Sequence, residues 1–206
     1  MSAIAAPLPS APRVVYPRVM PLPPSSPARW TAAEFHRVRA TGVWDGRRTY
    51  LVRGVIWEQG PMNPPHAALI KIVEKTLARV FTAGYCFRAQ VPLLLGLDTD
   101  PFPDVAVVSG DDEDYLTAHP TAAHLVVEVA DTSPDEDTST KAELYASGGI
   151  PDYWVLDVNA RRLLVFRDPR PFAGTTYRTT ITLTTADTIS PLALPTASVR
   201  VSDLIR

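Results

Sequence analysis

A glutamate stands inside a run of aliphatic residues at Leu125–Ala130, and this run constrains the fold more than any other segment. Because its residues are apolar on both faces, it predicts a strand in a sheet that is covered on both sides. An ionised carboxylate there costs several kcal/mol unless it is paired or bound to a cation. The run therefore predicts a buried sheet in which Glu128 has a partner. Two alternatives stay open: Glu128 lies at the open end of the strand, or it forms a salt bridge with an arginine.

A second carboxylate begins another apolar strand, Asp104–Ser109, directly after a proline. Taken alone, Asp104 is explained equally well as turn chemistry before a strand. Together, carboxylates on adjacent buried strands provide the oxygen ligands that a hard divalent cation such as Mg²⁺ needs.

A lysine completes this set. Lys141 shares one face of a predicted helix with Leu144 and Tyr145, so its stem should lean against the sheet that carries the carboxylates. The alternative is a solvated lysine in the first turn of that helix. Residues 98–157 contain 15 Asp or Glu and one Lys, a charge of −14, whereas residues 29–88 carry 10 basic against 4 acidic residues, a charge of +6. The isolation of Lys141 in the acidic segment favours a role in the site.

The remaining pattern predicts a mixed α/β fold without internal repeats or a glycine-rich phosphate loop. We expect a short helix that opens on the capping box Thr31–Glu34 and ends near residues 41–42. A long helix over residues 66–81 is started by the prolines of Asn63-Pro64-Pro65. A third helix is capped by Asp137 or Thr138 and runs to Tyr145. Expected strands cover residues 50–58, 86–91, 92–95, 104–109, 124–130, 153–157, 162–167 and 175–184, with additional edge strands in the last dozen residues.

The length of 206 residues suits one domain, which we place at residues 29–206. Residues 1–28 contain eight prolines and no apolar periodicity, so they are expected to form a flexible Pro-rich arm. No apolar run approaches the roughly 18 residues needed to span a bilayer, and we expect a cytoplasmic protein without a membrane partner. The single Cys86 excludes an internal disulfide and a cysteine-based zinc site, so any metal must be held by oxygen or histidine.

From about Trp30 to Pro169, the sequence resembles the Uma-two family within the PD-(D/E)XK nuclease superfamily. Three segments carry the resemblance: Pro103–Val108, Leu125–Val129 and Lys141–Asp157. The resemblance implies a restriction-endonuclease-like core, in which helices flank a central mixed β-sheet, and a metal-dependent endonuclease activity.

It also implies roles for individual residues. Asp104 and Glu128 correspond to the two metal-binding acids, and Lys141 to the catalytic lysine. The usual lysine position of the superfamily, two residues after the glutamate, is Ala130 here, so the lysine has moved onto the following helix. Glu58 and His66 match two further family positions, although His66 could equally be a neutral histidine with a backbone partner. The implied cofactor is Mg²⁺, with Mn²⁺ as a substitute.

The sequence departs from the family after Tyr50, where an acidic, glycine-containing segment is replaced by Leu51–Ile56. If one of the missing acids helps to position metal or water, the resemblance no longer implies activity, and Glu58 is then the one survivor of that group.

The predicted function is hydrolysis of phosphodiester bonds in nucleic acid, with DNA favoured, by a water that Mg²⁺ activates. The Arg-rich N-terminal third offers candidates for phosphate contacts, although a solvated surface explains them almost equally well. These are Arg37, Arg39, Arg47, Arg48 and Arg53. By analogy with nucleases that cut both strands, we expect a homodimer or higher homo-oligomer.

Two alternative functions remain. A nuclease-like fold that no longer cuts could act as a binding or assembly module, as the lost acids suggest. A purely structural oligomer could be built on exposed residues of Tyr153–Leu156, although that segment fits a core strand better.

Overall fold

The computed structural model describes residues 26–131, 134–170 and 176–205. Most of the predicted Pro-rich arm, residues 1–25, lies outside the described residues, so the division into an arm and one domain stays a prediction. Among the described residues, no helix combines the length and apolar composition that crossing a bilayer requires.

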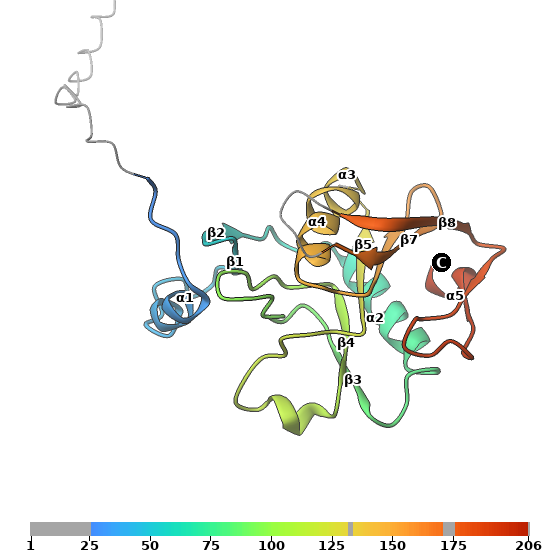
Figure 1. The fold of residues 1–206 in the computed structure, drawn as a ribbon, viewed down its shortest axis with the longest axis horizontal. Helices are drawn as coiled ribbons and strands as arrows, with labels where there is room; N and C mark the ends of the chain where they lie inside the picture. Colours follow the sequence, from blue (N-terminus) through green and yellow to red (C-terminus); the bar gives the residue numbers. More distant parts are fainter. Residues whose placement is uncertain (1–25, 132–133, 171–175, 206) are drawn as a thin grey trace, which may run out of the picture.

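A six-stranded mixed sheet forms the centre of the molecule (Figure 1). Its strand order is β3-β4-β5-β6-β7-β8, and all neighbours are antiparallel except β5 and β6. The strands are β3 (Tyr85–Arg88), β4 (Val105–Ser109), β5 (Leu125–Ala130), β6 (Asp152–Asp157), β7 (Arg162–Pro169) and β8 (Tyr177–Thr184). The predicted strands at these places are confirmed, with boundaries shifted by at most three residues.

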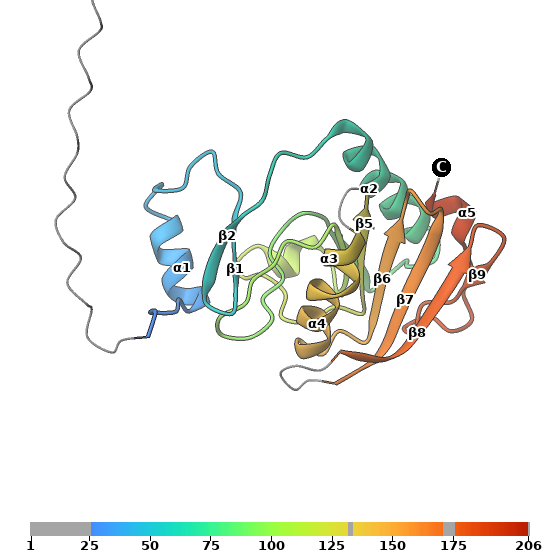
Figure 2. The same ribbon diagram turned by 90° about the horizontal axis from the view of Figure 1, so that it is seen from above.

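Alternate side chains of the central strands enter two separate apolar cores. Val105, Val127 and Val129 face the helix α2 (Pro64–Leu77) and the C-terminal helix α5 (Val201–Leu204). Ala106, Val126 and Ala130 face α4 (Thr140–Ser147). Burial of apolar side chains on both faces explains why these strands read as continuous aliphatic runs. Figure 2 shows α4 and α2 on opposite sides of the central strands.

The segment expected to be one strand over residues 50–58 is a hairpin instead. Strand β1 (Thr49–Val52) pairs with β2 (Val55–Glu58) in a two-stranded sheet of its own. Arg53 and Gly54 form the turn with φ values of 49° and 74°. Positive φ at both central residues is the geometry of a tight hairpin whose twist matches that of its strands.

The strand predicted at 92–95 is also wrong. Two of its backbone N–H groups bond within the loop that leads to β4: Leu93 donates to Pro101 O at 3.0 Å and Leu95 to Thr99 O at 2.8 Å. The N–H of Leu94 donates to Pro120 O at 2.9 Å. The loop is joined to the hairpin through Asp100, whose N–H donates to Leu51 O at 2.7 Å and whose carboxylate lies 2.6 Å from His36 Nε2. These contacts fix the hairpin beside the sheet.

The helices partly follow the predictions. The capping box of Thr31 and Glu34 opens α1 (Ala32–Arg39) as expected. Asn63 caps α2, which begins with the two expected prolines and ends at Leu77, before the expected end at residue 81. The third predicted helix corresponds to α4, and a short helix that was not predicted, α3 (Pro134–Thr138), precedes it. The N-cap of α4 is Ser139 rather than Asp137 or Thr138, and the Asp137 carboxylate is bonded to Lys141.

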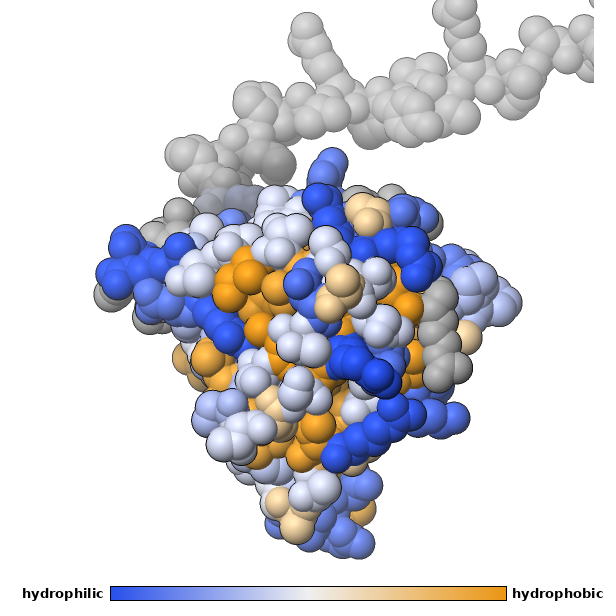
Figure 3. All heavy atoms as spheres, turned by 90° about the vertical axis from the view of Figure 1, so that its right-hand side faces the viewer, coloured by the Kyte–Doolittle hydropathy of each residue, from blue (hydrophilic) through white to orange (hydrophobic). Residues whose placement is uncertain are grey.

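The C-terminal residues contain one short strand and a helix rather than several edge strands. β10 (Val199–Arg200) pairs with β9 (Thr188–Ile189), and α5 follows directly. Val201 and Leu204 are buried at a spacing of three, which fits a helix that packs one side on the core. Figure 3 shows the end of the molecule that carries α5, where apolar patches lie between charged residues.

A buried carboxylate joins β6, β7 and the C-terminal segment. Asp152 is fully buried and accepts hydrogen bonds from Arg167 Nε at 2.9 Å, Trp154 Nε1 at 2.8 Å and the Leu192 N–H at 2.9 Å. Removing one partner of such a pair leaves an uncompensated charge in the interior. Asp152 is therefore a structural carboxylate.

We expect Asp152→Ala to lower the free energy of unfolding by about 3 kcal/mol, because Arg167 would lose its partner. Urea unfolding followed by circular dichroism measures this change. The control is Arg178→Ala, which removes the exposed pair with Asp168 and should change stability by less than about 0.5 kcal/mol. Equal effects of the two substitutions would contradict a structural role for Asp152.

Candidate functional site

Asp104 and Glu128 lie opposite each other on β4 and β5. The antiparallel register pairs Val105 with Val127, so its continuation by one residue brings Asp104 to Glu128. Both side chains point to the face that α4 covers, since they alternate with residues of the α2 face. Glu128 is 1% exposed and Asp104 is 3% exposed. Like charges directly opposite each other repel, so this arrangement requires donors or cations nearby.

Two donors on α4 satisfy Glu128. Tyr145 donates its hydroxyl to Glu128 Oε1 at 2.6 Å, and Lys141 Nζ lies 3.0 Å from Glu128 Oε2. Lys141 also lies 2.7 Å from Asp137 Oδ1, a carboxylate that is itself buried. The predicted contact between Lys141 and the sheet is present, and the alternative of a solvated lysine is not.

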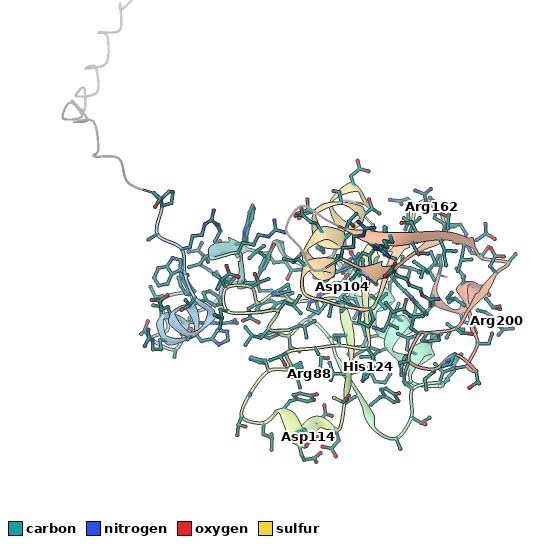
Figure 4. The ribbon with its side chains drawn as sticks, in the orientation of Figure 1. Arg88, Asp104, Asp114, His124, Arg162 and Arg200 are labelled. Atoms are coloured by element: carbon teal, nitrogen blue, oxygen red, sulfur yellow. The ribbon has the colours of Figure 1, made fainter. Side chains whose placement is uncertain are left out.

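Asp104 is held by three donors from different elements. The Val129 N–H donates to its Oδ2 at 2.8 Å, His66 Nε2 lies 3.1 Å from its Oδ1, and the side-chain amide of Gln90 donates to the same oxygen. His66 has a second carboxylate on its other ring nitrogen, with Asp131 Oδ1 at 3.5 Å. The partners of the His66 ring are therefore carboxylates rather than a backbone carbonyl. Asp104 lies inside the molecule, whereas Arg162 and Arg200 lie at its periphery (Figure 4).

The electrostatics show a shortage of positive charge. Burial raises the pKa of the Glu128 carboxyl to about 8. The charges of Asp104 and Asp137 also raise this pKa, whereas the charge of Lys141 lowers it. Burial acts to lower the pKa of Lys141, but the charges of Glu128 and Asp137 outweigh it and raise that pKa. The hydrogen bond to Asp104 raises the pKa of His66. Each group retains its proton more firmly than in water, as expected where carboxylates outnumber cations.

These side chains line one pocket of about 480 Å³ between the hairpin, α3–α4 and the sheet. Its polar residues include Asp104, Glu128, Asp137, Lys141 and His66. The same pocket is also lined by Tyr50, Trp57, Met62 and Phe102. Buried carboxylates and aromatic side chains therefore line one cavity.

Glu58 reaches this pocket but not its centre. It is exposed on β2 and lines the rim, where its carboxylate accepts from Arg47 Nη2 at 2.5 Å. Its described hydrogen bonds are with Arg47, which lowers the pKa of the carboxyl. The structure therefore brings together four of the five residues predicted for catalysis and leaves Glu58 apart from them.

The five predicted phosphate-contacting arginines do not converge. Arg53 lines the pocket and lies 2.9 Å from Glu143, and Arg48 donates to Gln90. Arg47 is bonded to Glu58, and Arg39 stacks over the Phe102 ring. Arg37 is exposed on α1 and does not line the pocket. A shared phosphate-binding surface stays a prediction.

Sequence reasoning missed several contacts in the site. Asp137 could have been found, because it stands four residues before Lys141 on a predicted helix, the spacing of a side-chain pair. No sequence pattern pointed to Gln90. This residue follows β3 with a φ of 57°, a backbone conformation that a residue with a side chain seldom adopts. This conformation places its amide between Arg48 and Asp104.

The residues present fit a divalent cation. Among residues 26–131, 134–170 and 176–205, no cluster of three or more His, Cys, Asp or Glu forms a closed metal site. Two buried, opposed carboxylates nevertheless match Mg²⁺, which proteins commonly bind through one or two carboxylates while substrate and water complete the shell. The site also lacks positive charge, which a cation would supply. Asp104 and Glu128 are the residues that would hold it.

The pKa of Glu128 predicts how the stability of the metal-free protein changes with pH. Its folded-state pKa of about 8 lies above the ordinary value of 4.5, so the folded state binds this proton more tightly than the unfolded state. The stability gained from the proton is complete below the ordinary pKa and is lost as the pH rises through about 8. Relative to Glu128→Gln, the wild type should lose on the order of 3 kcal/mol between about pH 5 and about pH 9. Urea unfolding in chelator at each pH measures the difference, and a constant difference would contradict the assignment.

Comparisons with known proteins support the fold and identify the family. The solved structure of a protein described as a "putative nuclease belonging to DUF820", from Anabaena variabilis, is similar over 76% of this chain and 88% of that chain, with a TM-score of 0.61 and 15% identity. At this identity the likeness shows the fold, and it confirms the mixed α/β class with helices on a central sheet. No curated protein matches the chain.

A family model named Uma2, described as "Putative restriction endonuclease", matches residues 32–202. This match extends across the hairpin and the central sheet, ends inside the C-terminal helix, and includes each of the pocket residues discussed above. The chain belongs to the Uma2 family.

Proposed function

We propose that this protein is a Mg²⁺-dependent endonuclease that hydrolyses phosphodiester bonds of nucleic acid, with DNA as the first substrate to test. The observation that carries the proposal is the pair of opposed, buried carboxylates, Asp104 and Glu128, with Lys141 bonded to one of them in an open pocket. Two such carboxylates beside a cationic donor are suited to phosphoryl chemistry, because charge develops on the phosphate oxygens during the reaction. A homodimer in the cytoplasm remains our expectation for the assembly and its location.

The mechanism assigns a task to each side chain. When bound, Mg²⁺ would lower the pKa of a water and neutralise charge on the phosphate. Asp104 and Glu128 would hold the ion, and Lys141 would donate from Nζ to a phosphate oxygen. The oxygen of water would form a bond to phosphorus as that water gives up a proton to the solvent, and the bond from phosphorus to one sugar oxygen would break as that oxygen takes up a proton from the solvent. His66, bonded to Asp104 and Asp131, would orient the Asp104 carboxylate.

Lys141 must leave Glu128 for this chemistry to proceed. In the described structure its ammonium satisfies Glu128 and Asp137. An ion on Glu128 would replace part of this attraction, and Asp137 would retain the ammonium at the same end of α4. The same contacts favour the alternative of a catalytically silent module, since the Lys141 ammonium is already bonded to both acids.

We expect purified protein to cut DNA only when Mg²⁺ or Mn²⁺ is present, with activity abolished by chelation. Metal binding measured by calorimetry should be strong in the wild type and weakened at least about tenfold in Glu128→Gln, since an amide is a poorer ligand than a carboxylate. Metal binding without cleavage of duplex or single-stranded DNA would favour the silent module. An unchanged metal affinity in Glu128→Gln would exclude Glu128 as a ligand.

Lys141→Met should lower the cleavage rate by about 10²–10³-fold, the usual effect of removing one donor to a transition-state oxygen. The matched control is Lys71→Met, because Lys71 is an exposed lysine on α2 outside the pocket. This control should cut at the wild-type rate. Gel electrophoresis of a labelled substrate under single-turnover conditions measures both rates, and equal rates for the two variants would remove Lys141 from the mechanism.

A further inference from the structure

The depth of the acids limits which form of nucleic acid can reach them. Glu128 and Asp104 are 1% and 3% exposed at the base of a pocket of about 480 Å³. This volume lies within the range of pockets for single small ligands. A DNA duplex is a stiff rod with a persistence length of about 50 nm, so its phosphates stay on the surface of the rod. A single strand can turn one nucleotide into such a pocket.

Aromatic side chains line the same pocket as the acids. Trp57 and Tyr50 are cross-strand partners in the β1–β2 hairpin, and the Tyr50 ring lies 6.0 Å from the Phe102 ring. All three residues line the pocket. Trp57 remains 53% exposed. Figure 2 shows the hairpin standing apart from the main sheet, beside α1, so Trp57 is carried by an element separate from the one that carries the acids.

The exposure of Trp57 does not by itself indicate a binding site, because scattered exposed apolar residues are common on proteins. Trp30 is 38% exposed, and Leu97 and Leu116 are exposed still further, at 86% and 81%. None of these three lines the pocket. Trp57 differs because it shares the pocket with both buried acids, and it is the one large exposed apolar residue, within the part of the chain that the structure describes, that does so.

The aromatic and the polar side chains of the pocket match the base and the phosphate of a nucleotide. An uncharged base has a π face that stacks on tryptophan, and such contacts hold single strands with little sequence preference. A phosphate is anionic and would need Lys141 together with a bound cation, because carboxylates outnumber cations beside the buried acids. We propose that the substrate is single-stranded or locally unpaired nucleic acid, with one base stacked on Trp57 while the neighbouring phosphate enters the pocket. This inference rests on the proposed function for the location of the phosphate.

The test measures binding separately from cleavage. Fluorescein-labelled single strands of about 12 nucleotides, and blunt duplexes of the same sequence, would be titrated with full-length protein in Ca²⁺, and fluorescence anisotropy would be recorded. The single strand should bind at least about tenfold more tightly than the duplex. Trp57→Ala should weaken single-strand binding about tenfold or more and leave duplex binding unchanged, since loss of one base stack is commonly worth about 1–3 kcal/mol.

Two variants control the experiment. Trp57→Phe keeps an aromatic face and should retain most of the affinity, whereas Trp30→Ala removes a tryptophan outside the pocket and should bind as the wild type does. Circular dichroism verifies that each variant is folded. Equal binding of both DNA forms, no binding of either form, or wild-type affinity in Trp57→Ala would each overturn the proposal.

Cleavage on the same samples separates this inference from the proposed function. Single-strand binding that depends on Trp57, without cutting in Mg²⁺ or Mn²⁺, would refute the nuclease and support the stacking site. Cutting of intact duplex at the same rate by wild type and Trp57→Ala would support the nuclease and overturn the stacking site.

Discussion

The repulsion between Asp104 and Glu128 determines the arrangement of the side chains around them. The register of β4 and β5 places the two carboxylates face to face, and the helices exclude water from both. Three neighbouring elements supply donors: α4 supplies Lys141 and Tyr145, α2 supplies His66, and β5 supplies a backbone N–H. Without these donors, two carboxyl groups could not be kept in an apolar interior.

Asp152 and Asp157, two further buried carboxylates, are satisfied differently. Each bonds an arginine and belongs to the sheet, with Arg167 and Arg162 at 2.9 Å. In each of these pairs, the charge of the arginine balances the charge of the carboxylate. At Glu128 the carboxylate pKa is raised, and the ammonium bonded to it is shared with a second acid. This contrast separates acids that hold the fold from acids that remain able to bind a ligand.

Much of the architecture could be predicted from local patterns, and the errors have physical causes. Aliphatic runs that contain a single acid identified β4, β5 and the site, because an ionised group is so costly to bury that its presence there needs a reason. The hairpin was missed because Arg53-Gly54 lacks the asparagine or aspartate that usually marks such a turn. The short helix α3 was missed because its segment, Pro134–Thr138, contains no aliphatic or aromatic residues whose spacing would mark a helix face. The contact between Gln90 and Asp104 could not be predicted from the sequence, because it depends on the backbone conformation of Gln90 rather than on a residue pattern.

The hairpin is joined to the rest of the molecule through the Leu51–Asp100 bridge, the backbone bonds of Gly54 and a small apolar cluster in which Leu51 is buried. Its residues line the pocket, whereas Glu128 lies on the central sheet. Substitutions at the exposed positions of the short segment Thr49–Glu58 can therefore alter part of the pocket lining while the buried acids stay untouched. In a protein built this way, the lining of the pocket and its buried acids can vary independently of each other.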